Sequence, residues 1–105
     1  MSEQVFLQRC EALLNRIEDL LGDSAIDHDT DRQGHVLTVT FEDDSQMVIN
    51  GQAVMQEIWL AYRGGAYHFR LSGAQWLDTR SGETLSAVLS RAVSAQAGQG
   101  VVFAV

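Results

Sequence analysis

Six short segments that alternate between apolar and polar residues lie between two segments of helical periodicity. We predict strands at residues 26–31, 36–41, 46–50, 57–62, 66–71 and 75–78, and helices at residues 3–21 and 83–96. The connections between strands are short and contain hairpin signals such as Arg32-Gln33-Gly34, which favour antiparallel neighbours. This order predicts an α+β fold, a two-layer α-β sandwich in which two helices pack on one face of an antiparallel sheet of about six strands. The length of 105 residues suits a single domain over residues 1–105.

The predicted helices have recognisable ends. Gly22 follows the last apolar residue of the first helix, and Ser81 precedes the second helix, where its hydroxyl can accept from the first free amides. Cys10 lies on the apolar stripe of the first helix, which predicts a small buried hydrophobic side chain. Because it is the only cysteine, the fold cannot depend on an internal disulfide.

Acidic residues dominate the charge and lie mostly in the first part of the chain. There are 14 acids, 7 arginines and no lysine, which gives a net charge of −7. Residues 1–44 hold 11 acids and 3 arginines, whereas residues 45–105 hold 3 acids and 4 arginines. Such a field repels nucleic acid and favours cations or a basic protein surface. No apolar run reaches the roughly 20 residues of a membrane helix, and we expect no targeting segment and a cytoplasmic protein.

The acids break local preferences near the end of the first helix and in the first strand. Acids at a helix C-terminus oppose the helix dipole, and aspartate is depleted in strands. Clustered carboxylates are hard oxygen ligands that suit Fe²⁺, Fe³⁺, Mn²⁺, Ca²⁺ or Mg²⁺ in an open, weak site. Spacing alone slightly favours the alternative, a solvated acidic face that binds nothing. The acids concerned are Glu18, Asp19, Asp23, Asp27, Asp29 and Asp31.

A tryptophan is expected on the solvent face of the sheet. In the segment 57–62, Trp59 alternates with apolar residues and shares its face with Glu57, while His68 and Arg70 share a face in the next strand. An exposed tryptophan beside arginine is typical of a protein-contact anchor. The alternatives are that a loop or tail covers it or that the two faces are reversed. We expect Trp76 in the core, His28 pointing inwards and His35 facing solvent.

A set of short motifs recurs in order along the chain. The motifs are Ile49-Asn50-Gly51-Gln52, Ile58-Trp59-Leu60-Ala61, Gly64-Gly65, Tyr67-His68-Phe69, Trp76 and Arg80-Ser81-Gly82-Glu83-Thr84. Together with the acidic first helix and first strand, this set resembles the bacterial frataxin family over nearly the whole chain. The chain departs from the family pattern in a shorter, less acidic loop after the first helix, and at Ala25, Gly51 and Val54.

The resemblance implies a fold, a metal and partners. The family fold is an α-β-α sandwich with an antiparallel sheet of five to seven strands. Family members bind iron weakly through acids that here correspond to Glu18, Asp19, Asp23, Asp27 and Asp29. Bacterial members dock this acidic ridge on a basic patch of the cysteine desulfurase and tune cluster assembly on the iron–sulfur scaffold protein. The predicted partner-binding residues are Glu11, Asp31, Asn50, Gln52 and Trp59.

Three classes of function follow for testing. The first is a non-enzymatic iron-binding regulator of iron–sulfur cluster assembly, a monomer that iron could drive into oligomers. The second is an acidic protein-interaction module without a physiological metal. The third is an iron-oxidising or iron-storing enzyme, which we rank last because such a centre needs enclosed carboxylates and the alternating strand acids are too exposed.

Overall fold

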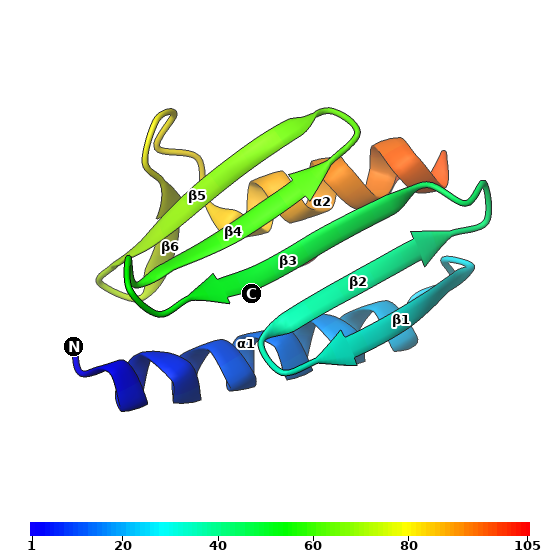
Figure 1. Cartoon of the computed structure of the whole chain (residues 1–105). Coiled ribbons are helices and arrows are strands. Elements are labelled where there is room, and N and C mark those ends of the chain that lie inside the picture. The colour runs from blue at the N-terminus through cyan, green and yellow to red at the C-terminus, as the bar shows by residue number, and fades with distance from the viewer.

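The computed structural model describes all 105 residues and contains one antiparallel sheet and two helices (Figure 1). The helices are α1 (Glu3–Gly22) and α2 (Leu85–Ala97). The six strands follow one another across the sheet in chain order. They are β1 (His28–Gln33), β2 (Val36–Phe41), β3 (Gln46–Gln52), β4 (Glu57–Tyr62), β5 (Gly65–Ser72) and β6 (Gln75–Asp78). The predicted fold class is confirmed.

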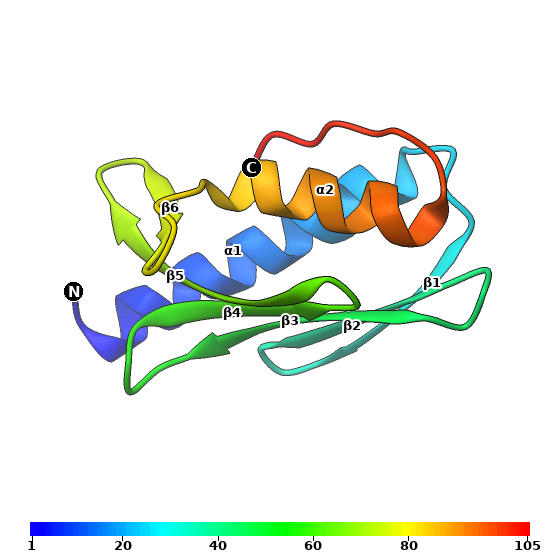
Figure 2. The same ribbon diagram turned by 90° about the horizontal axis from the view of Figure 1, so that it is seen from above.

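Both helices cover the same face of the sheet, and the other face is open (Figure 2). The apolar stripe of α1 packs on the inward-facing residues of the strands, and α2 adds a second stripe. Trp76 is buried and meets Phe6 edge-on, with ring centroids 6.1 Å apart, so its predicted core position is confirmed. Neither helix is long and apolar enough to cross a membrane. The fold therefore presents one sheet face, the helix flanks and the strand β1 as its accessible surfaces.

Several predicted bounds differ from the observed ones by one or two residues, and two elements, β1 and α2, begin two residues later than predicted. The first strand begins at His28 rather than at residue 26, because residues 24–26 still belong to the turn after α1, where Ser24 Oγ accepts the Ile26 N–H. The second helix begins at Leu85, and its N-cap is Thr84, whose hydroxyl accepts the Ala87 N–H at 3.1 Å. Ser81 accepts the Glu83 N–H at 3.2 Å, as its position suggested, but this amide lies before the helix; its hydroxyl also donates to the Asp78 carboxylate, so Ser81 is not the cap.

The last residues of the chain run along the helices on the side away from the sheet (Figure 2). Three serines of α2, spaced four residues apart, each accept the N–H of a tail residue at 2.9–3.0 Å and lie within 3.2 Å of the same residue's carbonyl oxygen. We call this set the serine ladder. Four helical residues rise about 6 Å and two extended residues about 6.7 Å, so the two repeats nearly match. The pairs are Ser94 with Val101, Ser90 with Phe103 and Ser86 with Val105.

A glycine in β3 allows α1 to approach the sheet closely. A Cβ atom at Gly51 would lie 2.6 Å from Cys10 Sγ and 3.3 Å from Cys10 Cβ. Cys10 is fully buried, as predicted, and burial raises the pKa of its thiol to about 11. The departure from the family pattern at Gly51 thus has a steric reason in this chain.

We expect Gly51→Ala to lower the free energy of unfolding by about 2 kcal/mol, because the added methyl group overpacks the contact with Cys10. In a Cys10→Ala background the sulfur is absent, so the same substitution should cost much less. Urea unfolding of the wild type, both single variants and the double variant measures this coupling. Equal losses in the two backgrounds would mean that the Cys10 contact is not the cause.

Candidate interaction and metal surfaces

The structure divides the predicted acids between two sides of β1. Opposite residues of paired strands share a face, and Leu37, Val39 and Phe41 of β2 all point into the core. Asp29 and Asp31 alternate with the β1 residues that face this core side, so their side chains lie on the open face of the sheet and are exposed. The acids of α1 lie on the helix side. The acids of α1 and those of β1 therefore do not form one continuous ridge. They lie on opposite sides of the sheet.

An arginine holds the helix acids together on the inner side of β1. Arg32 Nη1 donates to Asn15 Oδ1 at 3.1 Å and lies 3.5 Å from Glu18 Oε2, while Nη2 lies 3.2 Å from Glu11 Oε2. These partners are at positions i, i+4 and i+7 of α1 and so share one helix face. The Arg32 side chain is only 17% exposed, and its buried Nη2 makes no well-aligned hydrogen bond. We call this group the Arg32 clamp.

The Arg32 clamp was not predicted from the sequence. The signal available in the sequence was a single arginine at the end of the run of alternating aspartates, followed by a hairpin glycine. The clamp pairs Glu11 and Glu18, two acids predicted for partner or metal binding, with one arginine, which offsets part of their charge. These two carboxylates therefore differ electrostatically from the exposed acids of the strand and the loop.

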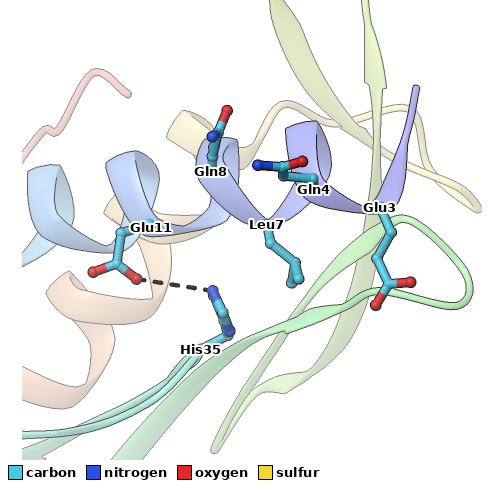
Figure 3. Close-up of a pocket in the computed structure, with 6 residues that line it drawn as sticks. All are labelled: Glu3, Gln4, Leu7, Gln8, Glu11 and His35. Atoms are coloured by element: carbon cyan, nitrogen blue, oxygen red, sulfur yellow. Dashed lines mark ion pairs between the residues drawn. The ribbon is translucent and has the colours of Figure 1, made fainter.

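Glu11 also borders an open groove between α1 and the start of β2 (Figure 3). His35 Nε2 lies 3.8 Å from Glu11 Oε2, the contact that is dashed in the figure. The expectation that His35 faces solvent was wrong in part, because its side chain is 34% exposed and lies against the helix. The groove is lined by Glu3, Gln4, Leu7, Gln8, Glu11 and His35.

The remaining predicted metal residues, Asp19, Asp23 and Asp27, are exposed and take part in no ion pair. Asp27 borders a hollow whose lining also includes Glu42 and Asp43 from the turn after β2. Hydrogen bonds from Ser45 and Arg63 lower the pKa of Asp43 to about 2. No three His, Cys, Asp or Glu side chains lie close enough together to hold a metal ion. The acidic surface thus extends to the β2–β3 turn, which the sequence analysis did not include.

The predicted partner residues of the sheet share the open face. Asn50, Trp59 and His68 lie opposite one another on β3, β4 and β5. Gln52 Nε2 donates to Asn50 Oδ1 at 3.1 Å. Trp59 lies on the expected face but is half-buried rather than exposed, because its ring stacks on His68 with centroids 4.3 Å apart and planes 8° apart. The two rings form a fixed aromatic pair.

Glu57 is the residue of this face that sequence reasoning placed wrongly. It was expected in solvent beside Trp59, but its side chain is only 5% exposed. Hydrogen bonds from Trp59 and Arg70 lower the pKa of the Glu57 carboxyl, and they outweigh the opposing effect of burial. The carboxylate is therefore ionised beneath the aromatic pair.

The fold and the sequence both resemble known proteins. Frataxin from Psychromonas ingrahamii superposes with a TM-score of 0.91 and 31% identity, covering 100% of both chains. Trimeric frataxin from Saccharomyces cerevisiae, complexed with ferrous iron, gives a TM-score of 0.70 and 25% identity over 94% of this chain and 88% of that one.

Sequence relatives agree with the structural match. The family model of the frataxin-like domain matches residues 1–99. The iron-sulfur cluster assembly protein CyaY of Paraburkholderia phymatum is 43% identical over 104 residues, 99% of each chain. The protein of the same name from Bordetella avium is 45% identical over 102 residues, 93% of this chain and 94% of the relative. The chain belongs to the frataxin family.

Proposed function

We propose that this protein is an iron-binding regulator of iron–sulfur cluster assembly rather than an enzyme. It docks through its acidic surface on the cysteine desulfurase and modulates cluster formation on the scaffold protein. The observation that carries the proposal is the similarity, over 99% of both chains, to a protein named iron-sulfur cluster assembly protein CyaY. The exposed acids of a chain with net charge −7 supply the physical basis for docking.

The docking surface in this proposal combines strand acids and the open sheet face. Asp29 and Asp31 are exposed and free of ion pairs, so their charge is available to a basic partner. Asn50, Gln52 and Trp59 lie on the same side of the sheet and supply hydrogen-bonding and aromatic contacts. The charges of Asp29 and Asp31 would steer association with a basic partner, and this effect weakens as salt screens them.

Iron is the cargo of the proposed surface, bound by carboxylates that are hard ligands for Fe²⁺ and Fe³⁺. Asp19, Asp23, Asp27 and Asp29 are exposed, so a bound ion would keep water ligands and bind weakly. Glu18 lies within the Arg32 clamp and contributes only if Arg32 releases it. Iron and the desulfurase would share Asp27 and Asp29, which would couple iron binding to docking.

The experiment is binding to the cysteine desulfurase of the same organism at low and high salt, with and without Fe²⁺ under anaerobic conditions. Asp29→Lys should raise Kd about tenfold at low salt, because it reverses a charge at the proposed contact. Glu3→Lys is the matched control, since it changes the net charge equally at an exposed site far along α1. Equal effects of the two variants, or an absence of binding at low salt, would refute docking through this surface.

A second candidate function is an acidic interaction module without a physiological metal. The Arg32 clamp favours it, because Arg32 already pairs with two acids that could otherwise hold a cation. This candidate gives salt-sensitive partner binding with no Fe²⁺ effect, so the same experiment separates the two.

The clamp gives a further prediction about cation binding. We expect Arg32→Gln to increase the affinity for Mn²⁺ or Co²⁺ severalfold, because the substitution frees Glu11 and Glu18. Arg9→Gln removes one positive charge from an exposed site of α1, the helix that carries Glu11 and Glu18, and should change the affinity little. Calorimetric titration of both variants measures the difference, after urea unfolding confirms that both are folded. An equal gain in both variants would mean that only the net charge matters.

A further inference from the structure

A buried carboxylate lies under the aromatic pair on the open face of the sheet. Glu57 begins β4, and its side chain points away from the helices because the next residue, Ile58, points into the core. A glutamate on a solvent-side strand face is normally exposed, yet this side chain is only 5% exposed. Burial of an ionised group is costly unless it is paired and hydrogen-bonded.

The Glu57 carboxylate meets three side chains of two strands. Oε1 accepts the Trp59 Nε1–H at 2.9 Å, and Oε2 accepts the Arg70 Nε–H at 2.8 Å. His68 Nδ1 lies 3.8 Å from Oε1. Both carboxylate oxygens are thus used, and Arg70 supplies the balancing charge. This pairing explains how the face accommodates a buried charge.

These contacts select one orientation of the indole ring. A half-buried tryptophan needs a partner for its N–H, and Glu57 lies two residues away on the same strand face. With the N–H directed at Glu57, the indole plane lies parallel to His68, at an interplanar angle of 8°. Without the carboxylate, the N–H must turn towards water, and the stacked arrangement loses the hydrogen bond that fixes it.

We propose that Glu57 is a positioning residue that holds Trp59 and His68 in the stacked orientation that an assembly partner contacts. Its role for a partner rests on the function proposed above, whereas its hold on the indole ring is a property of the free protein. Arg70 contributes by neutralising Glu57, so that the surface around Trp59 presents aromatic and amide groups rather than a net charge.

The first test follows the Trp59 indole N–H by NMR in the free protein. Glu57→Ala should speed its hydrogen exchange about tenfold, by loss of a charge-assisted hydrogen bond, and weaken the nuclear Overhauser contacts between the Trp59 and His68 rings. Glu57→Gln keeps an oxygen acceptor and should lie between the wild type and Glu57→Ala. The Trp76 indole, which is buried on the other side of the sheet, is the internal reference. Unchanged Trp59 signals in Glu57→Ala would overturn the proposal.

The second test measures affinity for the complex of cysteine desulfurase and scaffold protein. Glu57→Ala should raise Kd about tenfold, and Glu57→Gln should recover most of the loss. Cys10→Ala is the control for destabilisation, because Cys10 is fully buried on α1, on the helix side of the sheet, and its substitution should leave Kd unchanged. Unchanged affinity in Glu57→Ala, with the indole reoriented, would refute the partner role. If the wild type itself fails to bind, the proposed function fails, and the indole measurement still decides whether Glu57 positions Trp59.

Discussion

Replacing Asp78 with alanine is expected to lower the free energy of unfolding by about 4 kcal/mol at neutral pH, as is typical when a buried, hydrogen-bonded charge is removed. Asp78 ends β6 and is 6% exposed. Its Oδ2 accepts from the Ser81 N–H at 2.9 Å, from the Ser81 hydroxyl at 2.8 Å and from the Arg80 N–H at 3.3 Å. Its Oδ1 accepts from the His68 N–H at 3.1 Å. Alanine would leave these backbone donors without a partner, and the loop before α2 would lose its organising group.

The Asp78 effect should depend on pH in a definite direction. Burial raises the pKa of Asp78, but hydrogen bonds from Ser81, His68 and Arg80 outweigh it and hold the pKa below its usual value. Since the folded pKa lies below the unfolded value of about 3.9, the stabilisation is present above that value and is lost as the pH falls through the folded pKa. The free energies of unfolding of the wild type and Asp78→Asn, measured in urea, should therefore differ at neutral pH, and this difference should become smaller in acid. A difference that stays constant down to the acid limit of folding would exclude the ionised carboxylate as its cause.

Gln96→Leu should lower the free energy of unfolding by about 2 kcal/mol, because it removes three part-buried hydrogen bonds and leaves their partners unsatisfied. Gln96 of α2 is 5% exposed. Its Nε2 donates to the Gln46 carbonyl at 3.1 Å and to Ser45 Oγ at 2.9 Å, and its Oε1 accepts the Arg63 N–H at 2.9 Å. One side chain thus connects the end of α2 to two sheet turns.

Gln99→Leu is the control for Gln96, since Gln99 is exposed close to the same end of α2 and should tolerate leucine with little change. Hydrogen exchange of the Arg63 amide adds a local measurement, because this N–H donates directly to Gln96. It should exchange faster in Gln96→Leu. Protection equal to that of the wild type would contradict the assigned contact.

Period-two alternation predicted the sheet faces well, but it could not predict which polar residues are buried. Ile58 and Leu60 point into the core and Trp59 points out, as the alternation requires. Glu57 follows the same alternation and is nevertheless buried, because Trp59 and Arg70 fold over it. That burial depends on side-chain conformations across two strands, which a pattern along one strand does not contain.

The acidic surface could also be predicted only in part, because the sequence pattern does not show how α1 and β1 pack together. The acids themselves, Asp29 and Asp31 among them, are evident in the sequence as residues that disobey strand preference. Whether they lie beside the acids of α1 depends on the register of β1 on β2 and on the position of α1 over the sheet. Arg32 is the β1 residue that meets the acids of α1, and its three helix contacts join residues up to 21 positions apart in the chain.

The serine ladder has a geometrical limit that follows from its two repeats. From one pair of the ladder to the next, the helix advances about 6 Å and the extended tail about 6.7 Å. The offset between serine and tail residue therefore grows by about 0.7 Å per pair. Rows of residues four apart also wind slowly around a helix, which carries a fourth hydroxyl sideways. Three serine–tail pairs are thus close to the largest number that can keep straight hydrogen bonds. A fourth pair would need a hydroxyl four residues before Ser86, where α2 has not yet begun, and a shorter chain end would lose pairs one at a time.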